Sequence, residues 1–282
     1  MSDLSMLING LKVSAEGGST FERRNPLDGS VATRAPAASP TDAVLAVEAA
    51  AEAFESWSQT GPGARRALLL KAADALEAKT PQFIDAVSAE TGATGMWAGF
   101  NVMLAAGMIR EAASLTTQVA GEVIPSDVPG SLAMGIRQPA GVVLGIAPWN
   151  APVILGVRAI ATPLACGNTV ILKGSENCPR THQLIVEAFQ DAGFPPGVVN
   201  YLTNAPADAG AVVEAMVAHP AVRRVNFTGS TKVGRIIAMT CAKYLKPVVL
   251  ELGGKAPMVI LDDANIEDAV NGAAFGCFAN SG

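Results

Sequence analysis

The stretch Val248-Val249-Leu250-Glu251-Leu252-Gly253-Gly254-Lys255 decides how the rest of this sequence is interpreted. Its β-branched, apolar beginning predicts a buried strand, and its two glycines predict that the chain leaves the sheet directly afterwards. Glu251 would then lie at the carboxyl end of a strand, where open α/β sheets keep their ligands. Taken alone the stretch is ambiguous, because a glutamate at a strand end is more often a solvated cap than a catalytic group.

Four earlier stretches have the same design, so the region from Gly141 onward follows a regular β-α-β pattern. The predicted strands cover residues 142–147, 170–173, 198–202, 223–227 and 248–251. The predicted helices between them cover residues 153–165, 179–192, 206–218 and 231–244. Two of these helices end at glycines in C-cap positions, Gly167 and Gly193. Five strands joined by such helices predict an α/β fold with a parallel sheet and right-handed crossovers.

The residues before this region predict a loop-and-strand arm, a set of helices and a ribbon. The arm covers residues 6–35, and helices are predicted from Ser39-Pro40, after residues 61–63, from Thr80-Pro81 and over residues 94–119. The predicted apolar face of the first helix consists of Val44, Val47, Ala51, Phe54 and Trp57. Residues 123–137 alternate around a turn at Pro129-Gly130, which predicts a β-hairpin. A ribbon of this kind usually pairs with another chain or domain, so we expect an oligomer.

The composition excludes several classes of protein. Half of the 282 residues are apolar, 16% are charged, and the net charge is −5 without a Lys/Arg cluster, which argues against nucleic-acid binding. Prolines, asparagines and Arg158 interrupt the apolar residues 140–172, so buried strands and helices explain them better than a membrane hairpin. The beginning lacks the layout of a signal peptide and the four cysteines are far apart, so we expect a cytoplasmic protein with reduced thiols. Cys178 and His182 have helical spacing, but without a second pair we expect no metal site.

Polar residues at the first two strand ends predict parts of a site. The amide of Asn150 would donate a hydrogen bond to a developing oxyanion, although the spacing alone favours an N-cap for the following helix. Glu176, with Lys173 beside it, would accept hydrogen bonds from a ribose diol and would repel a 2′-phosphate. This arrangement favours NAD over NADP as the ligand. The alternative is an ion pair on the surface.

The end of the fourth strand predicts a phosphate site. Gly229 precedes a helix, whose first N–H groups and dipole favour a pyrophosphate. Gly229 and Gly234 also have the separation of a P-loop, but Arg235 and Ile236 follow where Lys and Ser/Thr are required. A nucleoside-triphosphatase is therefore excluded. The sequence contains no G-x-G-x-x-G motif, so a dinucleotide must bind in an atypical way.

Five ordered motifs closely resemble the NAD(P)-dependent aldehyde dehydrogenase superfamily, and the resemblance extends from Ile8-Asn9-Gly10 to the last residue. They are Pro148-Trp149-Asn150, Lys173-x-x-Glu176, residues 192–200, Phe227-Thr228-Gly229-Ser230 and Glu251-Leu252-Gly253-Gly254-Lys255. The resemblance implies a Rossmann-type five-stranded sheet, an N-terminal helical region, a protruding hairpin and the start of a second α/β domain. The implied cofactor-binding domain comprises residues 1–122 and 141–254, the oligomerisation hairpin residues 123–140, and the beginning of the catalytic domain residues 255–282.

The resemblance also implies roles for individual residues. It makes Asn150 the group that stabilises the oxyanion of a thiohemiacetal, and Glu251 the general base for the thiol or the deacylating water. It implies NAD as cofactor, with its adenosine ribose on Lys173 and Glu176 and its pyrophosphate against the Thr-Gly-Ser loop at Gly229 and Ser230. The further implied cofactor contacts are Ile146, Ala147, Pro148, Trp149, Ser175, Gly210, Phe227, Thr228, Val233, Gly234, Leu252 and Gly253. Gly210 stands alone, whereas many members have several glycines after the third strand.

The implied reaction is the NAD-dependent oxidation of an aldehyde to its carboxylic acid. The apolar run beyond Asn150, with Arg158 on its helix, is similar to enzymes that act on aromatic aldehydes such as salicylaldehyde or vanillin. In the family the nucleophilic cysteine follows a Phe-x-Asn-x-Gly motif, here Phe278, Asn280 and Gly282, so we expect it three residues further on. We expect the 282-residue chain to be inactive and its parent to be a homodimer or homotetramer acting on a small aldehyde. The alternative is a non-catalytic fragment that binds a dinucleotide or forms oligomers.

Overall fold

A computed structural model of the chain describes residues 2–280, and five parallel strands form its centre. These strands are β8 (Val142–Ile146), β9 (Thr169–Lys173), β10 (Val199–Leu202), β11 (Val222–Gly229) and β12 (Val248–Leu252). They lie in the order β12-β11-β8-β9-β10, and each neighbouring pair is parallel. The predicted parallel sheet is thus confirmed. The strand order reverses between β8 and β11, and a crevice at such a reversal is where doubly wound sheets bind ligands.

Within the described residues this sheet has seven strands, because two antiparallel strands extend the five predicted parallel ones. β2 (Met6–Ile8) and β3 (Leu11–Val13) extend it as an antiparallel hairpin beside β10. Asn9 and Gly10 form the two-residue turn with φ of 53° and 76°, as a type I′ turn requires. Two strands of three residues are too short to show an alternating pattern, which is why the sequence predicts only an arm.

The remaining N-terminal strands form a separate sheet. β1 (Ser2–Asp3), β5 (Val31–Pro36) and β4 (Thr20–Arg24) pair in that order, and the 3-10 helix η1 (Glu16–Gly18) precedes β4. The helix α1 (Pro40–Trp57) follows, and Ser39 caps it as predicted, with its side chain accepting from the Asp42 N–H group in a capping box.

The buried face of α1 differs from the predicted one. Ala43, Ala46 and Ala50 are buried together with Val47 and Trp57, whereas the predicted Val44, Ala51 and Phe54 are only partly buried. The helix packs against α7 (Ala209–Ala218) and the sheet through its alanines. Short side chains allow that close approach, so the buried stripe is rotated toward them.

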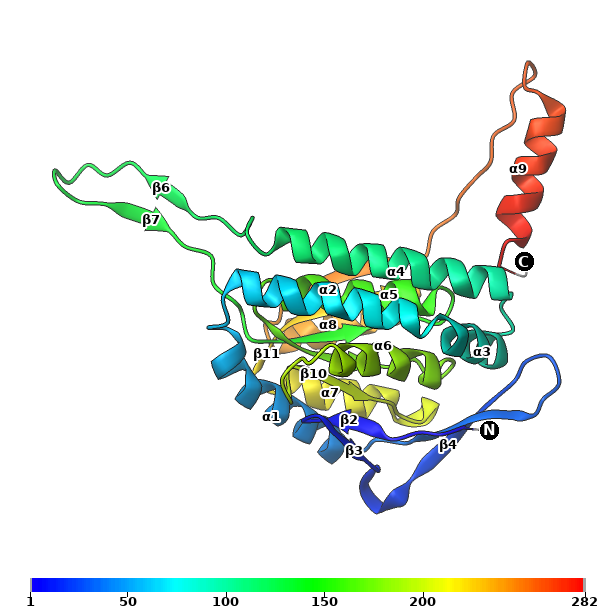
Figure 1. Cartoon of the computed structure of the whole chain (residues 1–282), viewed down its shortest axis with the longest axis horizontal. Helices are drawn as coiled ribbons and strands as arrows, with labels where there is room; N and C mark the ends of the chain where they lie inside the picture. Colours follow the sequence, from blue (N-terminus) through cyan, green and yellow to red (C-terminus); the bar gives the residue numbers. More distant parts are fainter. Residues whose placement is uncertain (1, 281–282) are drawn as a thin grey trace.

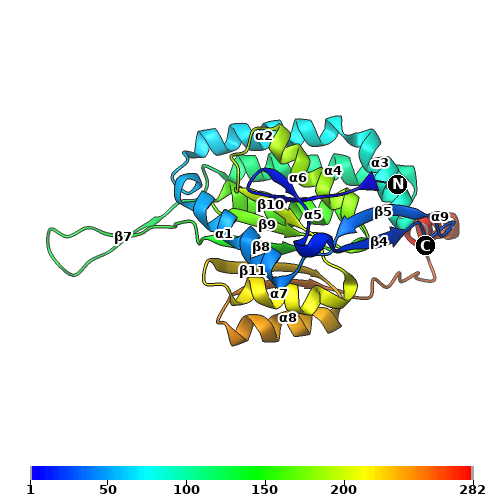
Figure 2. The same cartoon turned by 90° about the horizontal axis from the view of Figure 1, so that it is seen from below.

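Helices cover both faces of the large sheet (Figures 1 and 2). On one face lie α5 (Pro152–Ala165) and α6 (Pro179–Asp191), with α2 (Pro62–Ala78), α3 (Thr80–Thr91) and α4 (Gly95–Leu115) packed outside them. On the other face lie α1, α7 and α8 (Thr231–Lys243). Strand β8 contributes to both cores, because Val142, Leu144 and Ile146 point to one face and Val143 to the other.

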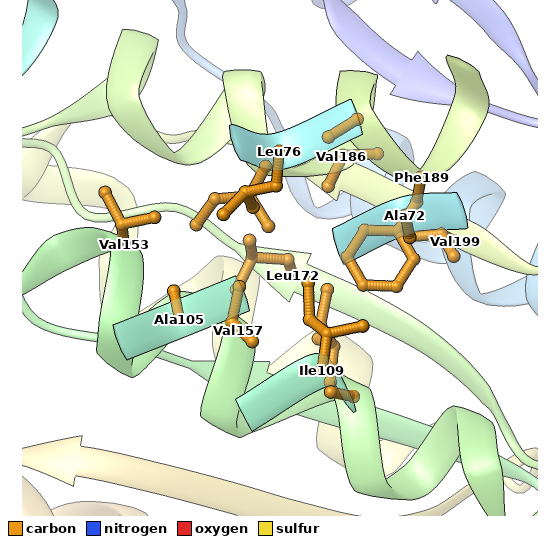
Figure 3. Close-up of a cluster of buried hydrophobic side chains, with 14 of the residues drawn as sticks. Ala72, Leu76, Ala105, Ile109, Val153, Val157, Leu172, Val186, Phe189 and Val199 are labelled. Carbon is orange, nitrogen blue, oxygen red and sulfur yellow. The ribbon is translucent and has the colours of Figure 1, made fainter. Parts of the chain in front are cut away.

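The core between the inner and outer helices fixes how the strand ends are placed. Figure 3 shows side chains of α2, α4, α5 and α6 meeting Leu172 of β9 and Val199 of β10. Phe189 of α6 contacts Phe194 edge-on at 5.1 Å between ring centroids. The loops that follow β8 and β9 therefore begin at strands that are fixed by a tightly packed core.

Two segments project from this body (Figure 1). One is the predicted hairpin, in which β6 (Glu122–Ile124) and β7 (Ala133–Gly135) pair antiparallel and their side chains are largely exposed. The other ends in α9 (Ile266–Phe278), whose apolar side chains are exposed. Helix α4 ends at Leu115, four residues earlier than predicted, and the predicted helix 206–218 begins as a 3-10 turn, η2 (Pro206–Asp208). In the described part of the chain, no helix combines the length and apolar character needed to cross a membrane.

Candidate functional site

A cleft of about 530 Å³ opens at the carboxyl ends of β8, β9 and β11, between α7 and α8. It lies at the reversal of strand order, where the fold class keeps its ligands. Thirteen of the residues expected to contact a cofactor line it: Ile146, Ala147, Pro148, Trp149, Lys173, Ser175, Glu176, Gly210, Phe227, Thr228, Gly229, Ser230 and Val233. Residues from four segments far apart in sequence thus meet in one cleft.

Three expected residues lie elsewhere in the described structure, outside the cleft lining: Gly234, Leu252 and Gly253. Gly234 packs against β12, since a Cβ atom there would come 2.4 Å from Leu252 Cδ2. This glycine therefore lets α8 approach the strand. Gly253 is exposed directly after β12.

Seven lining residues had no role in the sequence analysis: Asn177, Pro206, Ala209, Val213, Ile236, Ile237 and Thr240. Together with Val233, the three on α8 have the spacing of one helix face. This spacing could have indicated that the face lines a cleft, but an apolar stripe on a crossover helix normally predicts a core position. The cleft is where this stripe meets α7.

The turn from β11 into α8 has the geometry of an anion site. Ser230 is the N-cap of α8, and its Oγ accepts a hydrogen bond from the Val233 N–H group at 3.3 Å. Gly229 packs against the Phe227 ring, and a Cβ atom there would lie 2.6 Å from the ring Cζ atom. The beginning of a 13-residue helix thus lies at the cleft wall, and phosphate binds at such helix N-termini.

The end of β9 places a charged pair in the cleft wall. Lys173 Nζ lies 3.3 Å from Glu176 Oε2, and only 6% of the Lys173 side chain and 32% of the Glu176 side chain are exposed. Burial lowers the pKa of Lys173, and the neighbouring Glu176 opposes this. Burial pushes the pKa of Glu176 upward, but the Lys173 ammonium and the hydrogen bonds to the carboxylate together outweigh burial, so this pKa is lowered. The carboxylate therefore stays charged and suits a ribose diol.

Asn150 lies just outside the cleft, in the loop between β8 and α5. The N-cap of α5 is Ala151, and the part of the chain that the structure describes contains no side-chain cap hydrogen bond there, which removes the N-cap alternative for Asn150. The main-chain oxygen of Asn150 accepts from Trp97 Nε1 at 3.0 Å and from Asn280 Nδ2 at 3.1 Å. The loop is thus held from two sides, while the Asn150 residue remains exposed.

Glu251 lies at the end of β12, opposite Thr228 of β11 in the parallel register. Its Oε2 atom lies 3.1 Å from Arg158 Nη2, and the same nitrogen donates to Thr228 Oγ1 at 3.1 Å. Arg158 of α5 therefore bridges the ends of β11 and β12. The Glu251 side chain is 58% exposed, so the pair with Arg158 is accessible to solvent.

The four cysteines differ in their exposure. Cys178 and Cys241 are buried, Cys166 is partly buried and Cys277 is exposed. Among residues 2–280, no group of three or more His, Cys, Asp and Glu side chains is arranged to hold a metal ion. Of the expected motif before the nucleophile, Phe278 and Asn280 are described, whereas Gly282 lies outside the described residues.

Comparison with known proteins identifies the family of this chain. The aldehyde dehydrogenase family matches residues 12–282. A vanillin dehydrogenase from Pseudomonas fluorescens is 61% identical over 282 residues, which are 100% of this chain and 58% of that protein. The crystal structure of a salicylaldehyde dehydrogenase from Pseudomonas putida G7, complexed with salicylaldehyde, is 49% identical with a TM-score of 0.96. That match covers 99% of this chain and 57% of that one.

A third relative is PnpE, solved in complex with nicotinamide adenine dinucleotide. It is 39% identical with a TM-score of 0.92, and the match covers 98% of this chain and 56% of that one. The chain therefore spans a little over half the length of the relatives that it matches. With a family match over almost all of its residues, the chain belongs to the aldehyde dehydrogenase family.

Proposed function

We propose that the cleft binds NAD and that the whole protein oxidises an aromatic aldehyde to its carboxylic acid. The observation that carries this proposal is the meeting of three elements at one edge of the sheet. They are the Lys173–Glu176 pair, the beginning of α8 after Gly229 and the loop of Asn150. A ribose, a pyrophosphate and a reacting carbonyl need these three kinds of group.

The preference for NAD over NADP is argued from Glu176. Its carboxylate is kept charged by Lys173 at 3.3 Å, and a charged carboxylate at the ribose repels a 2′-phosphate. The NAD complex of PnpE supports the same cofactor. The nicotinamide of NAD would supply the acceptor for the hydride that the substrate loses.

In this proposal the residues of the chain act on the reacting carbonyl and on water. The side-chain amide of Asn150 donates a hydrogen bond to the oxyanion, and the loop that carries it is fixed by Trp97 and Asn280. Glu251 acts as the general base that activates the thiol or the deacylating water. Arg158, at 3.1 Å, fixes the direction of the Glu251 carboxylate until the base is needed.

The aromatic nature of the substrate is supported by the relatives, which are a vanillin and a salicylaldehyde dehydrogenase. It is also supported by Trp97 and Phe100 of α4, whose rings lie 5.5 Å apart beside the Asn150 loop. An aromatic aldehyde would gain contact with such a pair. We further propose that residues 123–137 join subunits, because Val123, Leu132 and Ile136 are at least 70% exposed on the projecting hairpin.

The test uses the purified whole protein with NAD and a panel of aromatic and aliphatic aldehydes, following NADH absorbance. Replacement of Glu251 by Gln should lower kcat by about 100-fold or more, while the Kd for NAD stays near that of the wild type. Glu77→Gln is the matched control, because Glu77 is also an exposed glutamate paired with an arginine, Arg110, at 2.7 Å. Wild-type protein without turnover on any aldehyde would refute the proposal, and normal turnover in Glu251→Gln would refute the role of Glu251.

A further inference from the structure

His182 of α6 contacts the loop after β9 and the first residue of α5, which follows the Asn150 loop, although it lies outside the cleft. It is completely buried. Its Nδ1 atom accepts a hydrogen bond from the Ser175 N–H group at 3.0 Å, and its Nε2 atom lies 3.1 Å from the Pro152 carbonyl oxygen. Ser175 directly precedes Glu176, and Pro152 follows Asn150 by two residues.

These two contacts define one form of the ring. The Ser175 N–H group is a donor, so Nδ1 must carry the lone pair, and the Pro152 carbonyl is an acceptor, so Nε2 must carry the proton. The two hydrogen bonds are therefore satisfied together only by the neutral Nε2–H tautomer. A protonated ring would place a proton on Nδ1 against the Ser175 N–H group.

We propose that His182 is a positioning residue that holds the ribose carboxylate loop and the oxyanion loop in a fixed relation. The inference rests on the proposed function, because it assigns the two loops to NAD and to the reacting carbonyl. Through Ser175 the ring sets the position of Glu176, and through Pro152 it sets the first turn of α5 next to Asn150.

The packing around the ring supports this role. α5 approaches α6 so closely that a Cβ atom at Gly156 would lie 2.5 Å from Ile185 Cδ1 and 3.3 Å from His182 Cδ2. Cys178 Sγ lies 3.8 Å from Nδ1 and 3.7 Å from Nε2. The sulfur is almost equally distant from both nitrogens and packs against the ring.

Burial keeps the ring neutral. Burial lowers the pKa of His182 to about 4; the Pro152 contact opposes this, Lys173 adds to it and Glu176 opposes it. The third titratable neighbour is Cys178, and burial raises the pKa of its thiol. At neutral pH the ring therefore has one lone pair and one N–H group, as the two contacts require.

The test separates the two hydrogen bonds with two amide variants of the whole protein. In His182→Asn the amide oxygen replaces Nδ1 and still accepts from Ser175, whereas the contact with Pro152 is lost. In His182→Gln the amide nitrogen replaces Nε2 and still donates to Pro152, whereas the acceptor for Ser175 is lost. A buried donor without an acceptor weakens what depends on it by about tenfold or more.

We expect a split between cofactor binding and catalysis. His182→Gln should raise the Kd for NAD, measured by calorimetry without aldehyde, by about tenfold with kcat changed by about twofold at most. His182→Asn should leave that Kd within about twofold and lower kcat by about fivefold. The control is His219→Gln, because His219 Nδ1 also accepts a main-chain N–H group, that of Ala221 at 3.2 Å, outside the cleft lining.

Equal effects of the two His182 variants on Kd and kcat would overturn the inference, as would an unchanged Kd in His182→Gln. A measurement without any variant is the distance from Ser175 N to His182 Nδ1 in a crystal structure of the NAD-bound wild type. A distance within 3.5 Å supports the inference, and a longer one overturns it. The proposed function fails separately, because it fails if the wild type itself neither binds NAD nor turns over an aldehyde.

Discussion

Glu90 of α3 contacts the beginning of α6, the helix that follows the Glu176 loop. Its replacement tests how the first turn of α6 is stabilised. The residue is fully buried. One carboxyl oxygen accepts from Thr33 Oγ1 at 2.9 Å and from the Arg180 N–H group at 2.7 Å. The other accepts from the Thr181 N–H group at 3.0 Å and from Thr181 Oγ1 at 2.8 Å. Burial raises the pKa of Glu90, and these four donors oppose the rise.

The two main-chain donors are those that an N-cap side chain normally satisfies. Cys178 is the N-cap of α6 and, within residues 2–280, its side chain makes no cap hydrogen bond, so Glu90 takes over that role from α3. In Glu90→Gln one oxygen becomes an NH₂ group, which faces the N–H group of either Arg180 or Thr181. One buried donor then lacks an acceptor, which costs about 2 kcal/mol. In Glu90→Ala both donors lack one, and the cost rises to about 4 kcal/mol.

Hydrogen–deuterium exchange measured by mass spectrometry reports this locally. A loss of about 2 kcal/mol should speed exchange at the first turn of α6 by roughly 30-fold in Glu90→Gln, and further in Glu90→Ala. Glu77→Gln, at the exposed pair with Arg110, should leave α6 unchanged, because such surface pairs contribute less than about 1 kcal/mol. If α6 exchanged in Glu90→Gln at the rate of this control, Glu90 would not cap α6.

Three further predictions concern the cofactor, the hairpin and acid. Glu176→Gln should raise the kcat/KM with NADP relative to NAD by about tenfold, and an unchanged ratio would remove Glu176 from the ribose site. The double variant Val123→Asp, Ile136→Asp should have a lower particle mass by light scattering than the wild type. The control Leu245→Asp, at a 90% exposed residue outside the hairpin, should keep the wild-type mass. A monomeric wild type would refute the hairpin contact. The pKa of His182 is lowered from 6.5 to about 4 in the folded protein, so the unfolded chain takes up this proton at a higher pH than the folded chain does. The stability that comes from this difference is present above pH 6.5 and is lost as the pH falls toward 4. Wild type should lose about 3 kcal/mol more than His182→Gln over that range, and parallel stability curves would contradict this.

The parallel sheet could be predicted because short strands alternate regularly with helices and are followed by polar or turn residues. The edge hairpin β2–β3 could not be predicted, because its strands have only three residues each. They are identified as strands only through their pairing with each other and with β10. On α1, periodicity located a helix, but the packing partner selected Ala43, Ala46 and Ala50 for the buried face. Periodicity describes a stripe, whereas the neighbouring surface decides which edge of that stripe is buried.

For the site, strand-end residues were predictable because the ends of parallel strands must meet at one edge. The contributions of helices were not, as Val213, Ile237 and Thr240 look like core positions until α7 and α8 are placed beside the cleft. The roles of Glu90 and His182 could not be predicted from the sequence either. Their partners lie 91 and 30 residues away, and a buried polar side chain shows its purpose only through the atoms that it contacts.

The most direct test of the central claim is a crystal structure of the whole protein with NAD. We expect the pyrophosphate to lie at the beginning of α8 beside Gly229 and Ser230, with the adenosine ribose hydroxyls on the Glu176 carboxylate. NAD found instead in the cavity of about 510 Å³ beside the amino ends of the strands, lined by Asn168 and Arg224, would contradict it.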